Sequence, residues 1–272
     1  MQLNKKNRLL HNLLLVNLAS GIGKTSIQFL ENAGLKAIFI LNALINLFLP
    51  PLYFKVFYRQ FVEIAFYSLP LVGLTSAFTG MVLALQSYMG FAMLSSEGAI
   101  SNIVVVSITR ELGPMLTALM VAGRISGSMA AEIGTMRVSE QIDALSTMSV
   151  NPIKYLITPR IIAGILALPL LTLLSDIIGI MGGYFIAIFQ LEFNSTLYIQ
   201  KTWNFLTAWD VISGLIKGAL FGLLITSMGC FFGYFSTKGA KGVGKSTTNA
   251  VVTACILIFV FDYILTAIFF NT

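Results

Sequence analysis

Residues 109–160, TRELGPMLTALMVAGRISGSMAAEIGTMRVSEQIDALSTMSVNPIKYLITPR, join an apolar helix of membrane length to a short polar segment. The apolar part contains Arg110, Glu111 and Pro114. Charged residues inside a membrane span are costly and indicate function by default, whereas a polar helix between two spans must lie outside the bilayer. This stretch therefore predicts a membrane protein that handles a ligand within the membrane and receives a signal from a partner beside it.

The composition of the whole chain also indicates a membrane protein. Of its 272 residues, 57% are hydrophobic and only 10% are charged, compared with about 25% charged residues in an ordinary soluble domain. The net charge of +6 does not indicate a nucleic-acid partner, because the basic residues are scattered between apolar segments. Cys230 and Cys255 lie in apolar runs and the chain has a single histidine, so we expect free thiols and no metal site. The fold class that follows is all-α and polytopic.

Five apolar segments are long enough to cross a bilayer, which takes about 20 residues. We predict one membrane domain over residues 61–272, with spans at about 63–90, 100–126, 160–190, 208–236 and 249–270. Glycines recur within these spans at the spacing that lets helix backbones approach closely. These sets are Gly123/Gly127, Gly179/Gly183, Gly214/Gly218/Gly222 and Gly229/Gly233. They predict a compact bundle and are compatible with a dimer.

Residues 1–60 are predicted to form amphipathic interfacial and elbow helices. Residues 9–36 mix leucines with charged residues, as in a helix that lies in the membrane interface. Residues 37–54 (AIFILNALINLFLPPLYF) approach spanning length. Their two asparagines and the Pro50-Pro51 pair favour a membrane-embedded elbow that does not fully cross.

Basic residues are unevenly divided between the two sides of the predicted bundle. The segment before residue 60, the loop between the second and third spans, and the loop between the fourth and fifth spans are all basic. Because Lys and Arg accumulate on cytoplasmic loops, we expect these segments on the cytoplasmic side, or on the stromal side of a plastid membrane. The carboxyl terminus then lies on the other side, where the loop at about 191–207 is long enough to hold a short helix.

Several charged residues fall inside the spans. Glu111 lies about eleven residues into the second span, which places it near mid-bilayer at ~1.5 Å per residue. Asp176, Lys217 and Asp262 fall at similar depths in the other spans. These residues either line a polar pathway, or Lys217 pairs with one of the acids inside the bundle and the pair only holds the helices together. For Arg110 and Glu111 we favour function, because the following Gly113-Pro114 breaks a helix and such breaks at membrane depth line cavities.

The segment from Met136 to Met148 reads as a short amphipathic helix between two spans. Val138, Ile142 and Leu145 share one stripe, and the acidic Glu140 and Asp143 lie away from it. One face would rest on its own protein, and the other would enter a groove on a soluble partner. An interfacial helix without a partner is the alternative.

The run Gly239-Ala-Lys-Gly-Val-Gly-Lys-Ser246 fits the phosphate-binding pattern G-x-x-x-x-G-K-[ST]. That pattern binds phosphate when it follows a buried strand and opens a helix, but here it lies between two predicted spans. We therefore interpret it as a glycine-rich loop, with Ser246 or Thr247 capping the last helix.

Together these features resemble the MlaE/YrbE/TGD1 permease family of MCE-associated lipid ABC transporters, over about residues 35–272. The resemblance rests on Arg110-Glu-Leu-Gly-Pro114, Ala122-Gly-Arg124, Ala131-Glu-Ile-Gly134, Met136-Arg137, Glu140-Gln141, Pro152, Pro159-Arg160, residues 242–252 (GVGKSTTNAVV) and Asp262-Tyr-Ile-Leu-Thr-Ala267. It implies a homodimeric permease with an elbow and five spans, a lipid cavity between the two copies, ATPase subunits on the cytoplasmic or stromal side, and an MCE-domain lipid-binding protein on the far side. This chain would bind no cofactor of its own, and ATP and Mg²⁺ would bind the ATPase.

The resemblance also assigns roles to individual residues. The lipid pathway would include Arg110, Glu111, Gly113, Pro114 and Tyr88, with Asp176, Lys217 and Asp262 as further intramembrane polar groups. A coupling helix at about 136–149 would dock on the ATPase through Arg137, Glu140, Gln141, Asp143, Leu145 and Met148.

Two other functional classes remain open at this point. A stand-alone secondary transporter or channel would use the intramembrane carboxylates as an ion relay and would work without an ATPase. An intramembrane lipid enzyme would need a nucleophile and a base, and no convincing pair is present. Replacing Glu140 and Asp143 should uncouple an ABC permease but leave a relay largely intact. Abundant Ile, Phe, Asn and Lys suit an AT-rich genome, so a plastid inner envelope membrane and a bacterial inner membrane both fit.

Overall fold

The computed structural model describes residues 23–24, 26–28, 30–48, 53–91, 97–237 and 239–270. No strand occurs among these residues. Five helical stretches are long and apolar enough to cross a membrane: Phe54–Gly90, Ala99–Val138, Ile153–Phe189, Ala208–Tyr234 and Ala240–Phe270. The all-α polytopic class predicted from the sequence is therefore confirmed.

The helices that build the first three stretches are shorter segments placed end to end. The first stretch contains α2 (Phe54–Ala65) and α3 (Leu69–Phe91), and the second contains α4 (Glu97–Ser107), α5 (Gly113–Val121) and α6 (Gly127–Val138). Within the second, π-helical segments at Ile108–Leu112 and Ala122–Ser126 connect α4 to α5 and α5 to α6. After α7 (Gln141–Thr147), a third π segment (Ile153–Ile157) leads into α8 (Thr158–Phe189). The chain ends with α9 (Ser195–Phe205), α10 (Ala208–Tyr234) and α11 (Ala240–Phe270).

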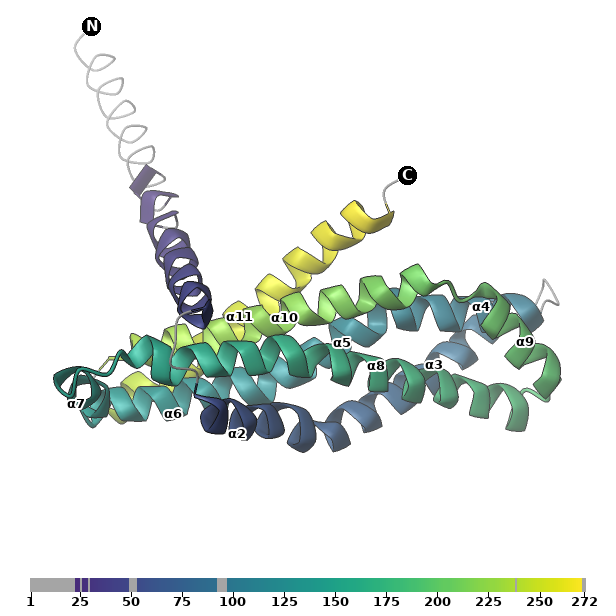
Figure 1. Cartoon of the computed structure of the whole chain (residues 1–272). Coiled ribbons are helices and arrows are strands. Elements are labelled where there is room, and N and C mark those ends of the chain that lie inside the picture. The colour runs from purple at the N-terminus through teal and green to yellow at the C-terminus, as the bar shows by residue number, and fades with distance from the viewer. Residues whose placement is uncertain are drawn as a thin grey trace, which may run out of the picture.

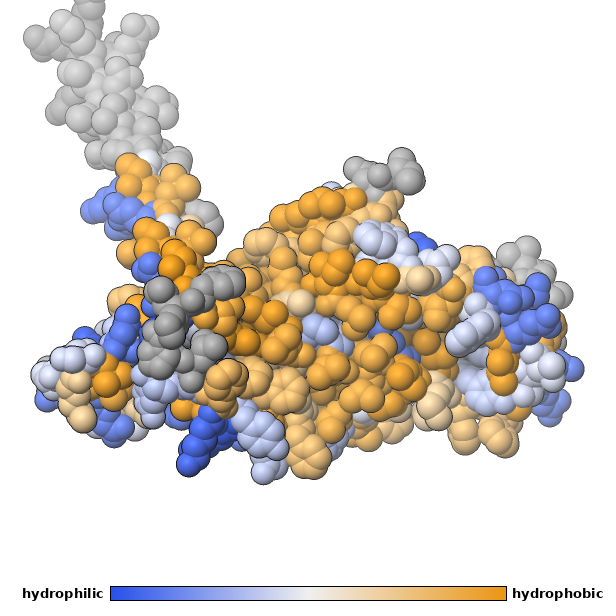
Figure 2. All heavy atoms as spheres, in the orientation of Figure 1, coloured by the Kyte–Doolittle hydropathy of each residue, from blue (hydrophilic) through white to orange (hydrophobic). Residues whose placement is uncertain are grey.

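The long helices lie side by side and form an elongated bundle (Figure 1). α8 packs against α3 and α10, and α10 also packs against α6 and α11. α7 lies at one end of the bundle and α9 at the other, and we call these the α7 end and the α9 end (Figure 1). Hydrophobic side chains cover the middle of the visible face, and hydrophilic ones gather toward the two ends (Figure 2).

Glycines bring several helix backbones into direct contact. A Cβ at Gly80 of α3 would overlap the carbonyl of Gly179 in α8, and a Cβ at Gly222 of α10 would overlap the carbonyl of Gly164. The glycine spacing thus explains close packing along α8 and α10. Gly123 is different, because a Cβ there would meet no heavy atom of another segment within 4 Å.

The amino-terminal region only partly overlaps the described residues. Residues 9–22, 25 and 29 of the predicted interfacial helix lie outside them, and so do residues 49–52 of the predicted elbow. Residues 30–45 are helical and continue into a 3-10 turn at Asn46–Phe48. This helix packs on the core through Phe39, whose ring lies 5.4 Å from that of Phe231 in α10. The first candidate span begins at Phe54 rather than near residue 63.

The helical stretches that contain the second and fifth predicted spans extend beyond the predicted span ends. The second continues to Val138 instead of ending near residue 126, so the predicted helix at 136–149 is wrong at its start. Met136 and Arg137 belong to the last turn of α6, and α7 covers only Gln141–Thr147. Glu140 separates the two helices because its backbone is left-handed, with φ of 59°.

The predicted glycine-rich loop before the last span is also wrong. α11 begins at Ala240, directly after Gly239, which turns the chain with a φ of +89°. Gly242 then allows close contact with the backbone of Thr237, where a Cβ would overlap its carbonyl oxygen. Ser246 lies inside the helix and does not cap it.

Candidate functional site

A π-helical segment carries Arg110 and Glu111. It covers Ile108–Leu112 and ends where the Gly113 amide donates to the Ile108 carbonyl, and Pro114 follows in the first turn of α5. The predicted break at Pro114 is therefore a local widening, and the helix runs on beyond it. Such π segments are frequent at functional sites.

The widened segment presents the backbone carbonyl of Arg110 to α10. Proline has no N–H, so Pro114 cannot supply the hydrogen bond that residue 114 of a regular helix would donate to the carbonyl of Arg110. Lys217 Nζ donates to that carbonyl instead, over 2.9 Å. The ammonium group of another span is thus a hydrogen-bond partner of this carbonyl.

Lys217 is the centre of a charge cluster that joins three spans. It is fully buried, and it also donates to Glu111 Oε2 at 2.7 Å and to Thr266 Oγ1 of α11 at 2.8 Å. An ammonium has three donors, and these bonds use all of them. Asp262 Oδ1 lies 3.1 Å from Nζ as an ion-pair partner without a hydrogen bond of its own.

Arg110 forms a further ion pair, with Asp210, beside the ion pairs of Lys217, and we count both residues as part of the same charge cluster. Its Nε donates to Asp210 Oδ1 over 2.7 Å, and its guanidinium lies over the ring of Phe270 at 4.4 Å from the centroid. The other oxygen of Asp210 accepts from the Thr207 amide and completes the capping box that begins α10. One carboxylate thus fixes both the start of α10 and the direction of Arg110.

The cluster lies nearer the α9 end than the α7 end. Lys217 follows nine residues after Ala208 in a helix of 27 residues, which is ~14 Å along an axis of ~40 Å. From the sequence we predict that the second span ends near residue 126, which would place Glu111 near mid-bilayer. The helical stretch that contains this span runs on to Val138, and Glu111 lies on the α9 side of the middle of that stretch.

Two residues assigned to the lipid pathway or its polar groups lie apart from the cluster. Asp176 of α8 is buried against Gly113, and neither of its carboxylate oxygens has a hydrogen-bond partner among the described residues. Gly113 is two positions along the helix from Glu111. The helix face that Asp176 contacts at Gly113 therefore differs from the face that carries the Glu111 side chain. Tyr88 packs at the α9 end against the ring of Phe193, with centroids 5.8 Å apart.

Sequence reasoning missed two members of the cluster. Asp210 had a readable signal, since Thr207 and Asp210 have the spacing of a capping box before an apolar run. Thr266 stands one helical turn after Asp262 and its hydroxyl lies within 3.0 Å of Glu111 Oε1. Only the packing of α11 against the π segment reveals that contact.

The α7 end holds the residues predicted to couple to an ATPase. Arg137 Nη1 lies 2.6 Å from Asp143 Oδ1, so these two residues join the end of α6 to α7. Ile142 is buried, whereas Gln141 and Met148 are exposed. A groove of about 270 Å³ lies beside α7 and is lined by Met136, Gln141, Ile142, Ala144, Leu145, Met148, Tyr155 and Leu156.

The described residues contain no group of three or more His, Cys, Asp or Glu side chains placed to hold a metal ion. Cys230 and Cys255 are free thiols in this part of the chain, the first buried and the second partly buried. The chemistry available at the cluster is therefore that of charges, hydroxyls and a backbone carbonyl.

Comparison with known proteins identifies the family. Residues 57–268 match the family described as Permease MlaE. The chain belongs to the MlaE permease family. It is 51% identical over 258 residues to a probable ABC transporter permease protein of Rickettsia felis, covering 95% of this chain and 100% of that protein.

Two further relatives carry more specific names. The intermembrane phospholipid transport system permease protein MlaE of Haemophilus influenzae is 34% identical over 259 residues, which cover 95% of this chain and 99% of that protein. The chloroplastic protein TRIGALACTOSYLDIACYLGLYCEROL 1 of Arabidopsis thaliana is 40% identical over 200 residues, which cover 73% of this chain and 57% of that protein. The region that matches the MlaE family contains the whole charge cluster and α7.

Proposed function

We propose that this MlaE-family chain is the transmembrane permease subunit of an ABC transporter that moves phospholipids or other polar lipids between membranes. The charge cluster carries the proposal, because a lipid needs polar groups for its head beside apolar surface for its tails. Arg110 is about a third exposed, and its terminal nitrogens have no hydrogen-bond partner among the described residues. A guanidinium with free donors suits a phosphate or another anionic headgroup. The phospholipid transport named for the Haemophilus relative supports the same class.

We further propose a homodimer with the lipid between its two copies. α11 supplies Asp262 and Thr266 to the cluster, yet only 11% of its most apolar window is buried in the single chain. Its exposed side chains include Ile256, Phe259 and Val260. A cavity between two copies would bring such apolar faces next to the partly exposed Arg110 and Glu111.

We assign ATP and Mg²⁺ to a separate ATPase subunit. In this chain the pattern that resembles a phosphate-binding loop is helical from Ala240 onward. Its amides therefore follow a helix instead of forming the open loop that cradles phosphate. Arg137, Glu140, Gln141, Asp143, Leu145 and Met148 lie on or beside α7, and this is the surface we propose for ATPase docking.

The proposed topology follows the basic loops. The α7 end, with its basic loops, faces the cytoplasm or the stroma, and an MCE-domain lipid-binding protein binds on the α9 side. We propose a bacterial inner membrane or a chloroplast inner envelope as the location; the Haemophilus relative is a bacterial protein, and the Arabidopsis relative is named chloroplastic.

The structure supports a route from α7 to the cluster. The Arg137–Asp143 ion pair joins α7 to α6, and the helix continues without a turn through α5 to Glu111. Movement of α7 on ATPase closure would shift this helix at the π segment and change the distance between Arg110 or Glu111 and the α10 side chains. The lipid responds only if it binds the two arrangements with different affinity.

The decisive experiment is purification of the full chain from its native membrane in mild detergent, with co-purifying proteins identified by mass spectrometry. We expect an ATPase with its own nucleotide-binding loop and an MCE-domain protein. Glu140→Ala combined with Met148→Ala should abolish ATP-driven lipid transport in proteoliposomes, whereas Lys201→Ala at the α9 end should not. Transport at full rate by the purified chain without an ATPase would overturn the proposal.

A stand-alone secondary transporter remains the second candidate function. The observation that favours it is Asp176, a buried acid whose oxygens have no hydrogen-bond partner among the described residues. That candidate predicts transport driven by an ion gradient and abolished by Asp176→Asn, with no response to α7 variants.

A further inference from the structure

α9 is held firmly at its end of the bundle. Asn194 begins it by accepting a hydrogen bond from the Leu197 amide at 3.1 Å, and only Leu206 and Thr207 separate it from α10. Ser195 Oγ lies 2.8 Å from the hydroxyl of Tyr184 in α8, so the first turn is also tied to the bundle. The position of α9 therefore depends on the ends of α8 and α10.

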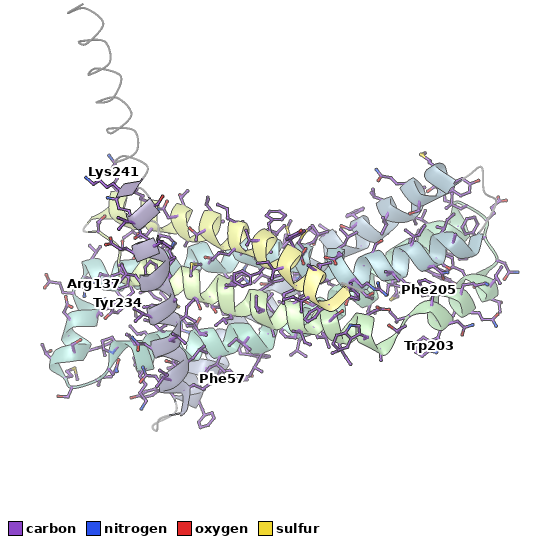
Figure 3. All side chains as sticks on the ribbon, turned by 90° about the horizontal axis from the view of Figure 1, so that it is seen from above. Phe57, Arg137, Trp203, Phe205, Tyr234 and Lys241 are labelled. Atoms are coloured by element: carbon purple, nitrogen blue, oxygen red, sulfur yellow. The ribbon has the colours of Figure 1, made fainter. Side chains whose placement is uncertain are left out.

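Only one face of α9 is covered by the protein. Tyr198 is buried, with its ring 5.8 Å from that of Tyr184, and α9 packs against α4 on this side. Ile199 and Trp203 stand one turn apart on a neighbouring stripe and are 54% and 77% exposed. Trp203 and Phe205 are both found at the α9 end in Figure 3.

A separate stripe of α9 is polar. Thr196, Gln200 and Asn204 recur at intervals of four residues and are all exposed. The helix thus has three faces: one against the protein, one apolar and exposed, and one polar and exposed. This division suits a helix that lies along a boundary between lipid and water.

Other aromatic side chains surround the same end of the bundle. Phe185 and Phe189 in the last turns of α8 are exposed, with their rings 4.8 Å apart. Trp209, at the start of α10, is half exposed and packs on Phe269 of α11. Trp203 and Trp209 are the two tryptophans of the chain. Tryptophan is enriched where a membrane protein crosses the headgroup region, because its ring is apolar and its N–H is polar.

We infer that α9 is an interfacial helix, whose Ile199–Trp203 stripe lies at the boundary between headgroups and acyl chains of the leaflet at the α9 end. The polar stripe then faces water. The occupant of this surface is membrane lipid, since the last turns of α8 and the first turn of α10, which flank α9 in the chain, also carry exposed aromatic residues.

The test uses the small number of tryptophans. Trp209→Phe leaves Trp203 as the only tryptophan of the full-length chain, which is reconstituted in phosphatidylcholine vesicles with bromine at a shallow or a deep acyl position. We expect strong loss of Trp203 emission with shallow bromine, a smaller loss with deep bromine, and little quenching by aqueous iodide. As a matched control, Met148→Trp in a chain that also carries Trp203→Phe and Trp209→Phe should be quenched by iodide and not by bromolipid.

The opposite pattern would overturn the inference. If iodide quenches Trp203 as fully as the control tryptophan and bromolipid does not, the stripe faces water. If bromolipid quenching is absent and iodide quenching appears only after co-purified proteins are stripped away, the stripe is a protein-docking surface. Should Trp209→Phe disturb folding, the difference in quenching between the wild type and Trp203→Phe reports the same side chain.

Discussion

Replacing Lys217 by methionine tests whether the charge cluster stabilises the fold. The substitution keeps the length of the side chain but removes two ion pairs and the hydrogen bond to the Arg110 carbonyl. Removing one partner of a buried ion pair costs about 3–5 kcal/mol, because the other charge stays buried without compensation. The side chain of Glu111 is 35% exposed and can regain water, whereas that of Asp262 is only 13% exposed. We therefore expect a loss near the low end, about 3 kcal/mol.

The measurement is reversible unfolding of the purified chain in mixed detergent–SDS micelles. A variant that combines Lys217→Met with Glu111→Gln and Asp262→Asn should recover most of the lost stability, because all three charges are gone. Lys241→Met, at the exposed start of α11, is the matched control and should change the free energy of unfolding by no more than about 0.5 kcal/mol. The reasoning is refuted if Lys217→Met costs less than about 1 kcal/mol, or if the triple variant is as unstable as the single one.

Three further predictions concern other parts of the chain. Gly113→Ala should lower the free energy of unfolding by about 1–3 kcal/mol in the same assay, because the new Cβ would overlap Asp176 Oδ1. Gly123→Ala, with open space around it, is the control and should be neutral or stabilising. Equal effects of the two substitutions would contradict this reasoning. Burial raises the pKa of Tyr198 from 10.0 to about 12. As the pH rises, this tyrosine therefore loses its proton in the unfolded state before it does so in the folded state. The free energy of unfolding should fall between pH 10 and 12, by at most about 3 kcal/mol. That fall should be absent in Tyr198→Phe, and an identical pH profile in both proteins would exclude Tyr198 as its cause. Asp143→Asn removes an exposed ion pair between α7 and the last turn of α6, so the free energy of unfolding should change by no more than about 1 kcal/mol. Amide hydrogen exchange in α7 should become faster. Unchanged exchange would show that the ion pair does not fix α7.

The sequence predicted the fold class and the family because both depend on long, local patterns. Apolar runs of spanning length and the motifs around Arg110 can be read without knowing how the helices pack. The internal ion pair of Lys217 was one of two alternatives that the sequence left open, and its acidic partners Glu111 and Asp262 were among the residues singled out. The sequence could not choose between acids at similar depths, since that choice depends on how α5, α10 and α11 are rotated against one another.

The boundaries and the finer geometry were harder to predict. Pro114 indicated an irregular helix. A π segment is distinguished from a kink by the carbonyl to which each backbone amide donates, and no residue type specifies that pattern of hydrogen bonds. α6 extends beyond the apolar run because its polar last turns pack against α10 and α11. The sequence predicts a loop after Gly239 because the segment is rich in glycine. In the fold Gly242 permits close contact with Thr237, so there glycine serves packing and not flexibility.

The full burial of Lys217 has a consequence for biosynthesis. A lysine at the centre of a helix opposes insertion into lipid by about 2.5–3.5 kcal/mol, and Lys217 lies about a third of the way along α10. α10 would therefore be a poor candidate for release from the insertion machinery by itself. Its ammonium is matched by Glu111 and by the carbonyl of Arg110, which are synthesised more than 100 residues earlier. We therefore expect the second span to stay beside the machinery until α10 emerges, and the two to leave it as a pair. α11, which supplies Thr266 and Asp262, then closes the site as the last of the five spans to be made.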